Sequence, residues 1–490
     1  MMNDKLIIRF GFLLLSVVLL LHLPFLTADP DMHLSTSRDA FTDEGLNTSQ
    51  LRNYINHGQL DFMECDNLVK TPLFNLALLI PLQIFGTHLA VARITILFIV
   101  FGLIFFLLSN VHLRPVVIVM SLTTLLQYYV FQYAHFSLSE MLSTVFILSG
   151  IFYLFLFIAN NCRQQIHLFL SSFFIALAYY SKIQFVYIIP LIPLVLVFFL
   201  LIKEKSVNFN KGSRTLIIAI GWMLFFLVFY IVCWYVPNRA IFNYVLNEES
   251  AGKYATLSSL PKTVAFNIVK VLFSTSNWIS NTLFFACFIT GCYLWNKNTD
   301  ARYKILFAIS TCWVFLEFHK LTMIYLPARY LVSYYFAAGF LSAVVISQLI
   351  FHQYKNAKLR YSGIALLSLF LLANAFDYFS LLVNRQFNIR NANNYFSESL
   401  SNNDDAVVLG PWAPSLTWDS RAISKPVWYH FMNDQDILQQ NPALIISEPD
   451  EAESNQAYSQ QGIELAAHAD SIRSFKIGRW EVMAYWITPH

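Results

Sequence analysis

Long apolar stretches recur along the chain up to about Val383, and most have the ~20 residues that a helix needs to cross a membrane. The first follows Lys5 and Arg9 as in a signal peptide, but no small-x-small cleavage site precedes Asp29, so we expect an uncleaved signal-anchor. A shorter apolar run at 72–87 would form a half-inserted helix. The pattern predicts eleven membrane spans, near residues 6–26, 89–109, 115–131, 139–159, 166–181, 184–202, 215–236, 277–295, 305–321, 328–351 and 363–383.

Two polar regions lie between these spans. One, at 237–276, mixes polar and apolar residues as an amphipathic interfacial segment does. The other, at 27–71, is the first outer loop and the candidate catalytic loop. It contains the carboxylates Asp29, Asp31, Asp39, Asp43, Glu44, Asp61, Glu64 and Asp66.

The composition changes to that of a soluble domain after Val383. A helix-like stretch runs from Trp428 to Gln440, and short apolar runs of strand length lie at Ala406–Leu409, Ala443–Ile446 and Val482–Ile487. This pattern predicts a small α/β domain in residues 384–490. For residues 1–383 we expect an α-helical polytopic membrane protein with about 11–13 transmembrane helices.

The composition excludes a soluble globular protein, since 57% of the residues are hydrophobic and 12% are charged, against roughly 25% charged in soluble proteins. With the N-terminus in the cytoplasm, the inner segments contain few acidic residues and the bases Lys5, Arg9, Arg114, Arg163, Lys203, Lys205, Lys211, Arg214, Lys297, Arg302, Lys304, Lys355, Lys358 and Arg360. This one-sided excess follows the positive-inside rule. It predicts a multi-pass protein of the cell (inner) membrane, with 27–71, 237–276 and 384–490 outside the cytoplasm.

Several kinds of function lack support in the sequence. There is no Walker-type glycine loop, which argues against an ATP-driven pump. The six cysteines show no CxxC or Cys/His metal spacing and predict no disulfide framework. No cofactor is expected with certainty, a divalent metal is not indicated, and no nucleic-acid partner is expected.

The first candidate for chemistry is Asp43-Glu44 in the first outer loop. An ionised carboxylate there could act as a general base and take the proton from an acceptor hydroxyl or amine as it attacks. A solvated loop would carry the same dipeptide, so the pattern alone leaves both interpretations open.

Two lysines are predicted at the depth of lipid head groups. Lys70 stands where the polar loop turns into the apolar run that begins at Thr71-Pro72, and Lys182 lies in the short outer turn between two spans. Both could contact a lipid phosphate, and both could instead be lysines that snorkel from a helix end. A positive charge in an outer turn opposes the positive-inside trend, so Lys182 is the stronger candidate of the two for a functional role.

A further group follows at the outer end of a later span. Arg329 could grip a phosphate with its planar fork, and Tyr330 could add a hydroxyl donor. Glu317 and His319 could ligate a divalent ion, although two candidates without a third give a weak signal. Arg93 and Glu140 lie just inside their spans on the same side, and the structural expectation is that they pair with each other.

The topology places Asp43, Lys70, Lys182 and Arg329 on one membrane face, although they come from four distant places in the sequence. A base, two lysines and an arginine suit a phosphate-linked lipid substrate that enters from the bilayer, because fixed cations offset the charge that builds on a leaving phosphate.

At this point the sequence resembles a known family. Asp43-Glu44, Lys70-Thr71-Pro72 with the apolar run closed by Gly86, Ala92-Arg93, Ser181-Lys182 and Pro327-Ala328-Arg329-Tyr330 are similar, in order, to motifs of C-type membrane glycosyltransferases. The nearest branch is glycosyltransferase family 39, which includes protein O-mannosyltransferases and bacterial aminoarabinose lipid A transferases. The likeness covers about 350 residues of the membrane body.

The resemblance implies a polyprenyl-phosphate sugar donor, transfer with inversion, and an extracytoplasmic acceptor that is a lipid, a polysaccharide or a protein. By the same likeness Asp43 is the catalytic base with Glu44 beside it, and Lys70, Lys182, Arg329 and Tyr330 bind the donor phosphate. Lys-Thr-Pro replaces the family's Lys-Pro-Pro, and Val69 stands where an acidic residue often precedes the lysine. These departures put a metal role in doubt.

Three alternatives remain. A lipid or polysaccharide flippase would usually place charges along mid-span cavities, whereas these charges gather at one surface. A glycan polymerase or ligase with a diphosphate-linked donor would favour arginine-rich outer loops. A structural anchor for the C-terminal domain would not need eleven spans.

Overall fold

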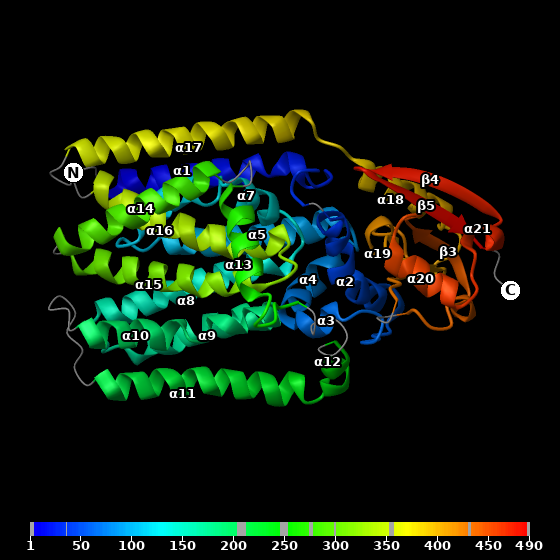
Figure 1. Cartoon of the computed structure of the whole chain (residues 1–490), viewed down its shortest axis with the longest axis horizontal. Coiled ribbons are helices and arrows are strands. Elements are labelled where there is room, and N and C mark those ends of the chain that lie inside the picture. The colour runs from blue at the N-terminus through cyan, green and yellow to red at the C-terminus, as the bar shows by residue number, and fades with distance from the viewer. Residues whose placement is uncertain are drawn as a thin grey trace.

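The computed structural model describes residues 4–35, 37–202, 212–245, 253–273, 278–297, 300–351, 357–429 and 433–487. Long helices run along the longest axis of the molecule, and a small domain with a sheet lies at one end of them (Figure 1). Glu248 and Glu249 of the predicted interfacial segment, and the inner bases Lys203, Lys205, Lys211 and Lys355, lie outside the described residues.

The first half of the membrane body is a set of apolar helices with one polar helix, α2, near the start. Its elements are α1 (Asp4–Leu21), η1 (Leu23–Phe25), α2 (Asp39–His57), α3 (Asn67–Lys70), α4 (Pro72–Phe85), α5 (Leu89–Leu108), α6 (Arg114–Thr123), α7 (Tyr128–Ala134), α8 (Ser139–Ala159), α9 (Gln165–Ser181), η2 (Ile183–Ile188) and α10 (Leu191–Ile202).

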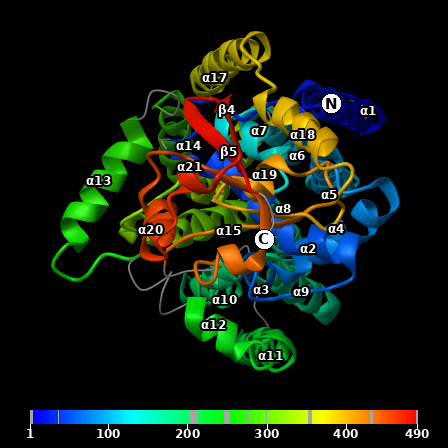
Figure 2. The same ribbon diagram turned by 90° about the vertical axis from the view of Figure 1, so that its right-hand side faces the viewer.

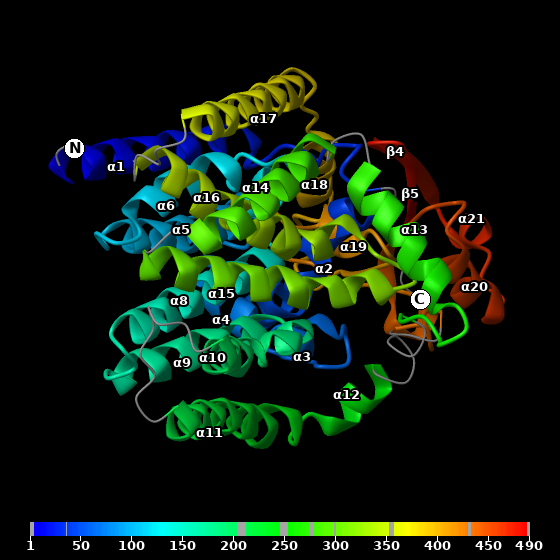
Figure 3. The same ribbon diagram turned by 60° about the vertical axis from the view of Figure 1, so that its left-hand side comes forward.

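The second half ends in a long helix on the outside of the bundle. Its elements are α11 (Gly212–Tyr230), η3 (Ile231–Tyr235), α12 (Arg239–Val245), α13 (Leu260–Phe273), α14 (Trp278–Lys297), α15 (Ala301–Glu317), η5 (Phe318–Thr322), η6 (Ala328–Leu331), α16 (Val332–Phe351) and α17 (Ala357–Val383). Helices α8 and α16 form the buried centre of the body, while α11, α13 and α17 lie at its periphery (Figures 2 and 3).

Among the described residues, nine helices are long and apolar enough to cross a membrane, and a bent pair raises the number to ten. Nine of the predicted spans correspond to these helices. The span predicted at 115–131 is not one continuous helix, because α6 and α7 meet there at 97° and pass as a span only as a bent pair. Gln127 accounts for the break, since its side chain accepts a hydrogen bond from Val130 N and begins α7 as a new helix. The span predicted at 166–181 corresponds to α9, a shorter apolar helix, and the run at 72–87 to α4.

The C-terminal domain contains a mixed sheet. Within the described part of the chain its order is β2-β1-β3-β5-β4, with β1 parallel to β2 and β3, and β5 antiparallel to β3 and β4. The domain is built from α18 (Asn388–Ser399), β1 (Val407–Leu409), α19 (Ala413–Leu416), β2 (Ile423–Lys425), η7 (Leu438–Gln440), β3 (Pro442–Ser447), α20 (Ala452–Gln460), α21 (Leu465–His468), β4 (Ser471–Ile477) and β5 (Trp480–Trp486).

The three apolar runs predicted as strands are confirmed as β1, β3 and β5. The helix expected at Trp428–Gln440 is wrong for the described residues, where the only helical turn in this stretch is η7. Strands β2 and β4 were not predicted. β2 contributes only three residues, and β4 is a largely exposed edge strand whose apolar residues Ile472, Phe475 and Ile477 form no continuous run.

Helix α2 joins the body to the C-terminal domain. Gly45 makes this possible, because a Cβ there would lie 2.5 Å from the backbone of Pro414 in α19. Arg52 then donates hydrogen bonds to the carbonyl oxygens of Pro414 and Thr417. The helix ends at Gly58, whose φ of 72° is the left-handed conformation that favours glycine. Part of the polar stretch predicted as a loop, Asp39–His57, is therefore a buried helix between the two parts of the molecule.

Candidate active site

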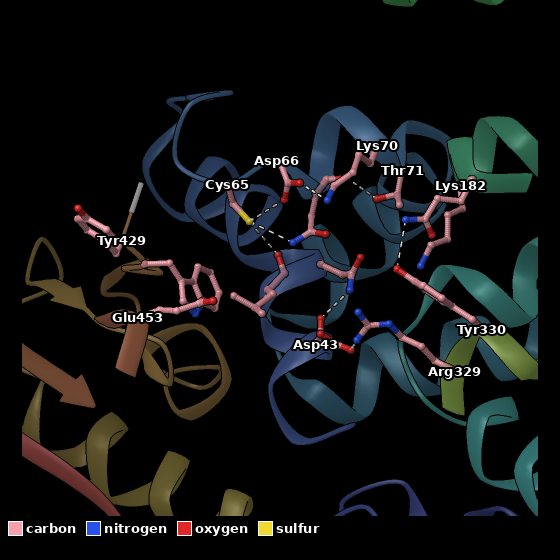
Figure 4. Close-up of a pocket in the computed structure, with 15 residues that line it drawn as sticks. Asp43, Cys65, Asp66, Lys70, Thr71, Lys182, Arg329, Tyr330, Tyr429 and Glu453 are labelled. Carbon is pink, nitrogen blue, oxygen red and sulfur yellow. Dashed lines mark hydrogen bonds and ion pairs between the residues drawn. The ribbon is translucent and has the colours of Figure 1, made fainter. Parts of the chain in front are cut away.

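A cavity of about 400 Å³ opens between the end of the membrane body and the C-terminal domain. Five of the six residues predicted from the sequence line it: Asp43, Lys70, Lys182, Arg329 and Tyr330. Figure 4 shows these residues on α2, α3, the end of α9 and η6, with Tyr429 and Glu453 of the C-terminal domain across the cavity. The chain thus brings together residues that are far apart in sequence.

Asp43 faces the cavity from the first turns of α2 and forms an ion pair with Arg329. The same guanidinium nitrogen lies 3.6 Å from Asp39, one helical turn earlier. Pro327 precedes the short helix η6, and its extended backbone turns Arg329 towards α2. One arginine therefore lies between two carboxylates at the edge of the cavity.

Lys70 is held at the last position of α3. The backbone bends at Thr71, and Pro72 has no N–H with which to continue the helix, so α4 begins anew. Lys70 forms an ion pair with Asp66, one turn earlier on the same face. The Lys-Thr-Pro sequence therefore fixes a lysine at a helix junction that faces the cavity.

Lys182 caps the C-terminus of α9 in an extended conformation. Its ammonium group donates to Glu140 of α8 at 2.5 Å and lies 5.2 Å from the ring centre of Tyr330. Glu140 is also 3.6 Å from Nε of Arg329, and only 2% of its surface is exposed. One buried carboxylate thus positions two cations of the cavity.

Glu44 does not line the cavity, although the sequence placed it beside Asp43 as a catalytic candidate. Successive residues of a helix point about 100° apart, and Glu44 turns into the protein interior. It accepts hydrogen bonds from Arg93 Nε at 2.9 Å and from the backbone N–H of Ser137 at 2.6 Å. The pairing expected between Arg93 and Glu140 is therefore wrong: Arg93 pairs with Glu44, and Glu140 with Lys182.

Glu317 and His319 do not form a metal site with a third residue. Among the described residues, no group of three or more His, Cys, Asp or Glu side chains is arranged to hold a metal ion. Glu317 is buried and accepts hydrogen bonds from Lys320 at 2.6 Å and Tyr187 at 2.6 Å. It belongs to an internal ion-pair network behind the cavity.

Sequence reasoning missed most of the polar lining that surrounds the predicted residues. The missed members are Asn47, Cys65, Asp66, Asn67, Gln184, Trp428, Tyr429 and Glu453. Asp66 could have been found from its i,i+4 spacing to Lys70. Burial and the neighbouring Asp66 raise the pKa of the Cys65 thiol to about 12.

No protein-family model and no curated protein matches the sequence. Solved structures match over almost the whole chain. ArnT from Cupriavidus metallidurans in the apo state aligns at 13% identity with a TM-score of 0.62, covering 97% of each chain. ArnT bound to undecaprenyl phosphate gives 13% identity and a TM-score of 0.59, covering 97% of this chain and 98% of that one. The oligosaccharyltransferase of Archaeoglobus fulgidus, in complex with Zn and sulfate, gives 10% identity and a TM-score of 0.53, covering 89% of this chain and 68% of that one.

This chain has the C-type membrane glycosyltransferase fold. The predicted fold class is thereby confirmed, including the small C-terminal domain. Membership of glycosyltransferase family 39 stays a prediction.

The cavity combines carboxylates and cations within one small volume. Each of Lys70, Lys182 and Arg329 contacts a carboxylate, so their positions are fixed without a ligand. A phosphate that enters can share or replace these carboxylates, because planar guanidinium and ammonium groups bind both kinds of anion. Asp43 would then be freed from Arg329 beside the bound phosphate.

Proposed function

We propose that this protein is a membrane glycosyltransferase that moves a sugar from a polyprenyl-phosphate donor to an extracytoplasmic acceptor. The observation that carries the proposal is the single cavity lined by Asp43, Lys70, Lys182, Arg329 and Tyr330. The shared fold with ArnT, which binds undecaprenyl phosphate in one of its solved structures, supports the same class of donor.

In this mechanism the donor phosphate lies among the three cations. Arg329 turns from Asp43 to the phosphate, and Asp43 accepts the proton of an acceptor hydroxyl or amine. The acceptor atom bonds to the anomeric carbon from the side opposite the phosphate, the bond from that carbon to the phosphate oxygen breaks, and the sugar inverts. Polyprenyl phosphate leaves with the bond electrons, and its growing charge is stabilised by Lys70, Lys182 and Arg329.

The donor class can be tested directly. The purified protein in lipid vesicles is given polyprenyl-phosphate sugars and, separately, the matching nucleotide sugars. We expect turnover of a polyprenyl-phosphate sugar alone, with release of polyprenyl phosphate. Full activity with a nucleotide sugar and no polyprenyl lipid would refute the proposal.

We further propose that the cavity and residues 384–490 lie outside the cytoplasm. The basic excess of the predicted inner segments supports this orientation. A reporter that is active only in the cytoplasm, fused after His490, is expected to stay silent, whereas a periplasmic reporter at the same site is expected to be active. Strong signal from the cytoplasmic reporter would contradict the orientation.

A further inference from the structure

A second cavity, of about 750 Å³, lies on the other side of the segment from Pro327 to Leu331. Arg329 and Tyr330 line the first cavity, while Pro327, Ala328 and Leu331 line the second. The two cavities therefore share the short helix η6 as a wall.

The second cavity has an apolar side that belongs to membrane helices. Trp278 and Ile279 come from α14, and Phe376 and Leu381 from α17. Helix α17 lies on the outside of the bundle (Figure 1), and 75% of the Phe376 surface and 54% of the Trp278 surface are exposed. An apolar chain in the surrounding hydrocarbon can reach the cavity along these side chains.

The polar side of the second cavity carries two carboxylates, Asp31 and Asp377. They are close enough to repel each other, and Asp31 accepts a hydrogen bond from Tyr128 at 2.5 Å. The basic side chains of the lining are His33 and Lys270, and Lys270 donates to the carbonyl oxygen of Leu326 at 2.8 Å. This balance disfavours a phosphate and favours a head group that donates hydrogen bonds to the carboxylates.

Asp39 connects the two cavities electrostatically. It lies 3.6 Å from Arg329 of the first cavity, and its charge acts on Lys270 and Tyr325 of the second. Asp39 and Asp43 occupy one face of α2, a single turn apart. The charge of a carboxylate one turn from the proposed base therefore acts on residues of both cavities.

We propose that the second cavity binds the acceptor, and that the acceptor is a membrane lipid whose head group carries hydroxyl or amino groups and no net negative charge. The role as acceptor rests on the proposed function. The binding of such a lipid does not, and it can be measured without turnover.

The test uses the full chain in vesicles and three photoreactive probes with the same diazirine-bearing alkyl chain and a glucose, an amino or a phosphate head. Labelled peptides are identified by mass spectrometry. We expect the glucose or the amino probe, or both, to label α14 and α17 beside the second cavity, and the difference between them separates a hydroxyl head from an amino head. The phosphate probe is expected to label the first cavity.

Two variants separate a filled cavity from a misfolded protein. Ala373→Trp fills the second cavity and should lower labelling by the uncharged and amino probes about tenfold, while phosphate labelling of the first cavity stays unchanged. Leu372→Trp, at the neighbouring position that is 69% exposed, is the matched control and should label normally. Asp377→Asn should reduce the preference for these probes over the phosphate probe.

A transfer assay then separates the two proposals. If both hold, Ala373→Trp loses transfer to the lipid acceptor while slow hydrolysis of the donor by water persists. If the second cavity is labelled but the protein transfers no sugar from a polyprenyl donor, the lipid site stands and the proposed function is refuted. Equal labelling of the second cavity by all three probes, or labelling that Ala373→Trp and Asp377→Asn leave intact, would overturn the lipid site.

Discussion

Two neighbouring carboxylates of α2 pair with arginines in very different surroundings. The cavity pair, Asp43 with Arg329, lies at the edge of an open cavity, and 18% of the Arg329 side chain is exposed. The interior pair, Glu44 with Arg93, has no exposed arginine surface, and Arg93 also donates to the carbonyl oxygens of Phe25 and Ala28. The first pair can exchange partners with a ligand, whereas the second is fixed by its hydrogen bonds.

The difference explains how one acidic dipeptide can serve two purposes. A carboxylate used in proton transfer needs access to the substrate and a partner that it can release. A carboxylate that holds helices together needs every hydrogen bond satisfied, because an unpaired buried charge is very costly. A helical dipeptide meets both needs, since its two side chains point in different directions.

Removing the charge of Asp43 is expected to have the largest effect on the cavity pair. Asp43→Asn keeps the size of the side chain but removes the proton acceptor, so we expect the rate of sugar transfer to fall ~10²–10⁴-fold, with little change in donor binding. The measurement is single-turnover transfer in vesicles. Asp61→Asn, a neutralised carboxylate of the same region outside the cavity lining, is the control and should transfer normally. Near-normal transfer by Asp43→Asn would move the base to another carboxylate, with Asp66 the first to test.

The interior pair should respond in stability rather than in chemistry. Arg93→Met leaves Glu44 buried without its partner, and we expect a loss of about 3–5 kcal/mol of folding free energy. Thermal unfolding of the detergent-solubilised protein measures this loss. The double variant Arg93→Met with Glu44→Gln should recover part of it, because no unpaired charge then remains. If Arg93→Met unfolded like the wild type and lost only transfer, the interior pair would belong to the catalytic machinery.

The body of the fold could be predicted because membrane helices are recognisable in a sequence by their length and their apolar composition. The exceptions are local. The helix pair at α6 and α7 lies in one apolar run, and only the hydrogen bond at Gln127 marks where the second helix begins, while strand β4 is exposed along most of its length. The buried helix α2 was missed because it packs with polar side chains, and its burial depends on contacts with both α4 of the body and α19 of the C-terminal domain.

The site was predictable in its cations but not in its pairings. Lysine and arginine stand out where an apolar chain has few charges, and this found Lys70, Lys182 and Arg329. Which carboxylate faces which cation depends on helix rotation and on crossings between distant segments. That is why Arg93 was assigned to Glu140 rather than Glu44. Trp428, Tyr429 and Glu453 reach the cavity only through the placement of the C-terminal domain, and no motif marks them.

Removing the charge of either lysine of the cavity is expected to have a smaller effect than removing the charge of Asp43. Lys70→Met and Lys182→Met keep the apolar stem and remove the charge, and each should raise the KM for the donor by about 10- to 100-fold, since a charged hydrogen bond is worth ~1.5–3 kcal/mol. If both touch one phosphate, the double variant should lose less than the sum of the single losses. Lys262→Met, on the exposed side of α13, is the control. Additive losses would show that the lysines serve different groups.

The smallest expected effect concerns Cys65, which borders the cavity without taking part in its charge pattern. Burial and Asp66 raise the pKa of the thiol to about 12. A raised thiol pKa favours the protonated form, so at pH 8 the reactive thiolate of Cys65 is much rarer than that of an ordinary cysteine. We expect a maleimide at pH 8 to leave Cys65 unmodified and transfer unchanged, with the modified cysteines identified by mass spectrometry of peptides, since Cys233 and Cys292 are exposed. The matched variant is Cys65→Ala with Asn47→Cys, which places a thiol on the accessible lining of the same cavity. This thiol should react with the maleimide, and the modified protein should lose transfer because the bulky adduct blocks the donor. Rapid modification of Cys65 in the wild type would show that this side of the cavity opens in solution.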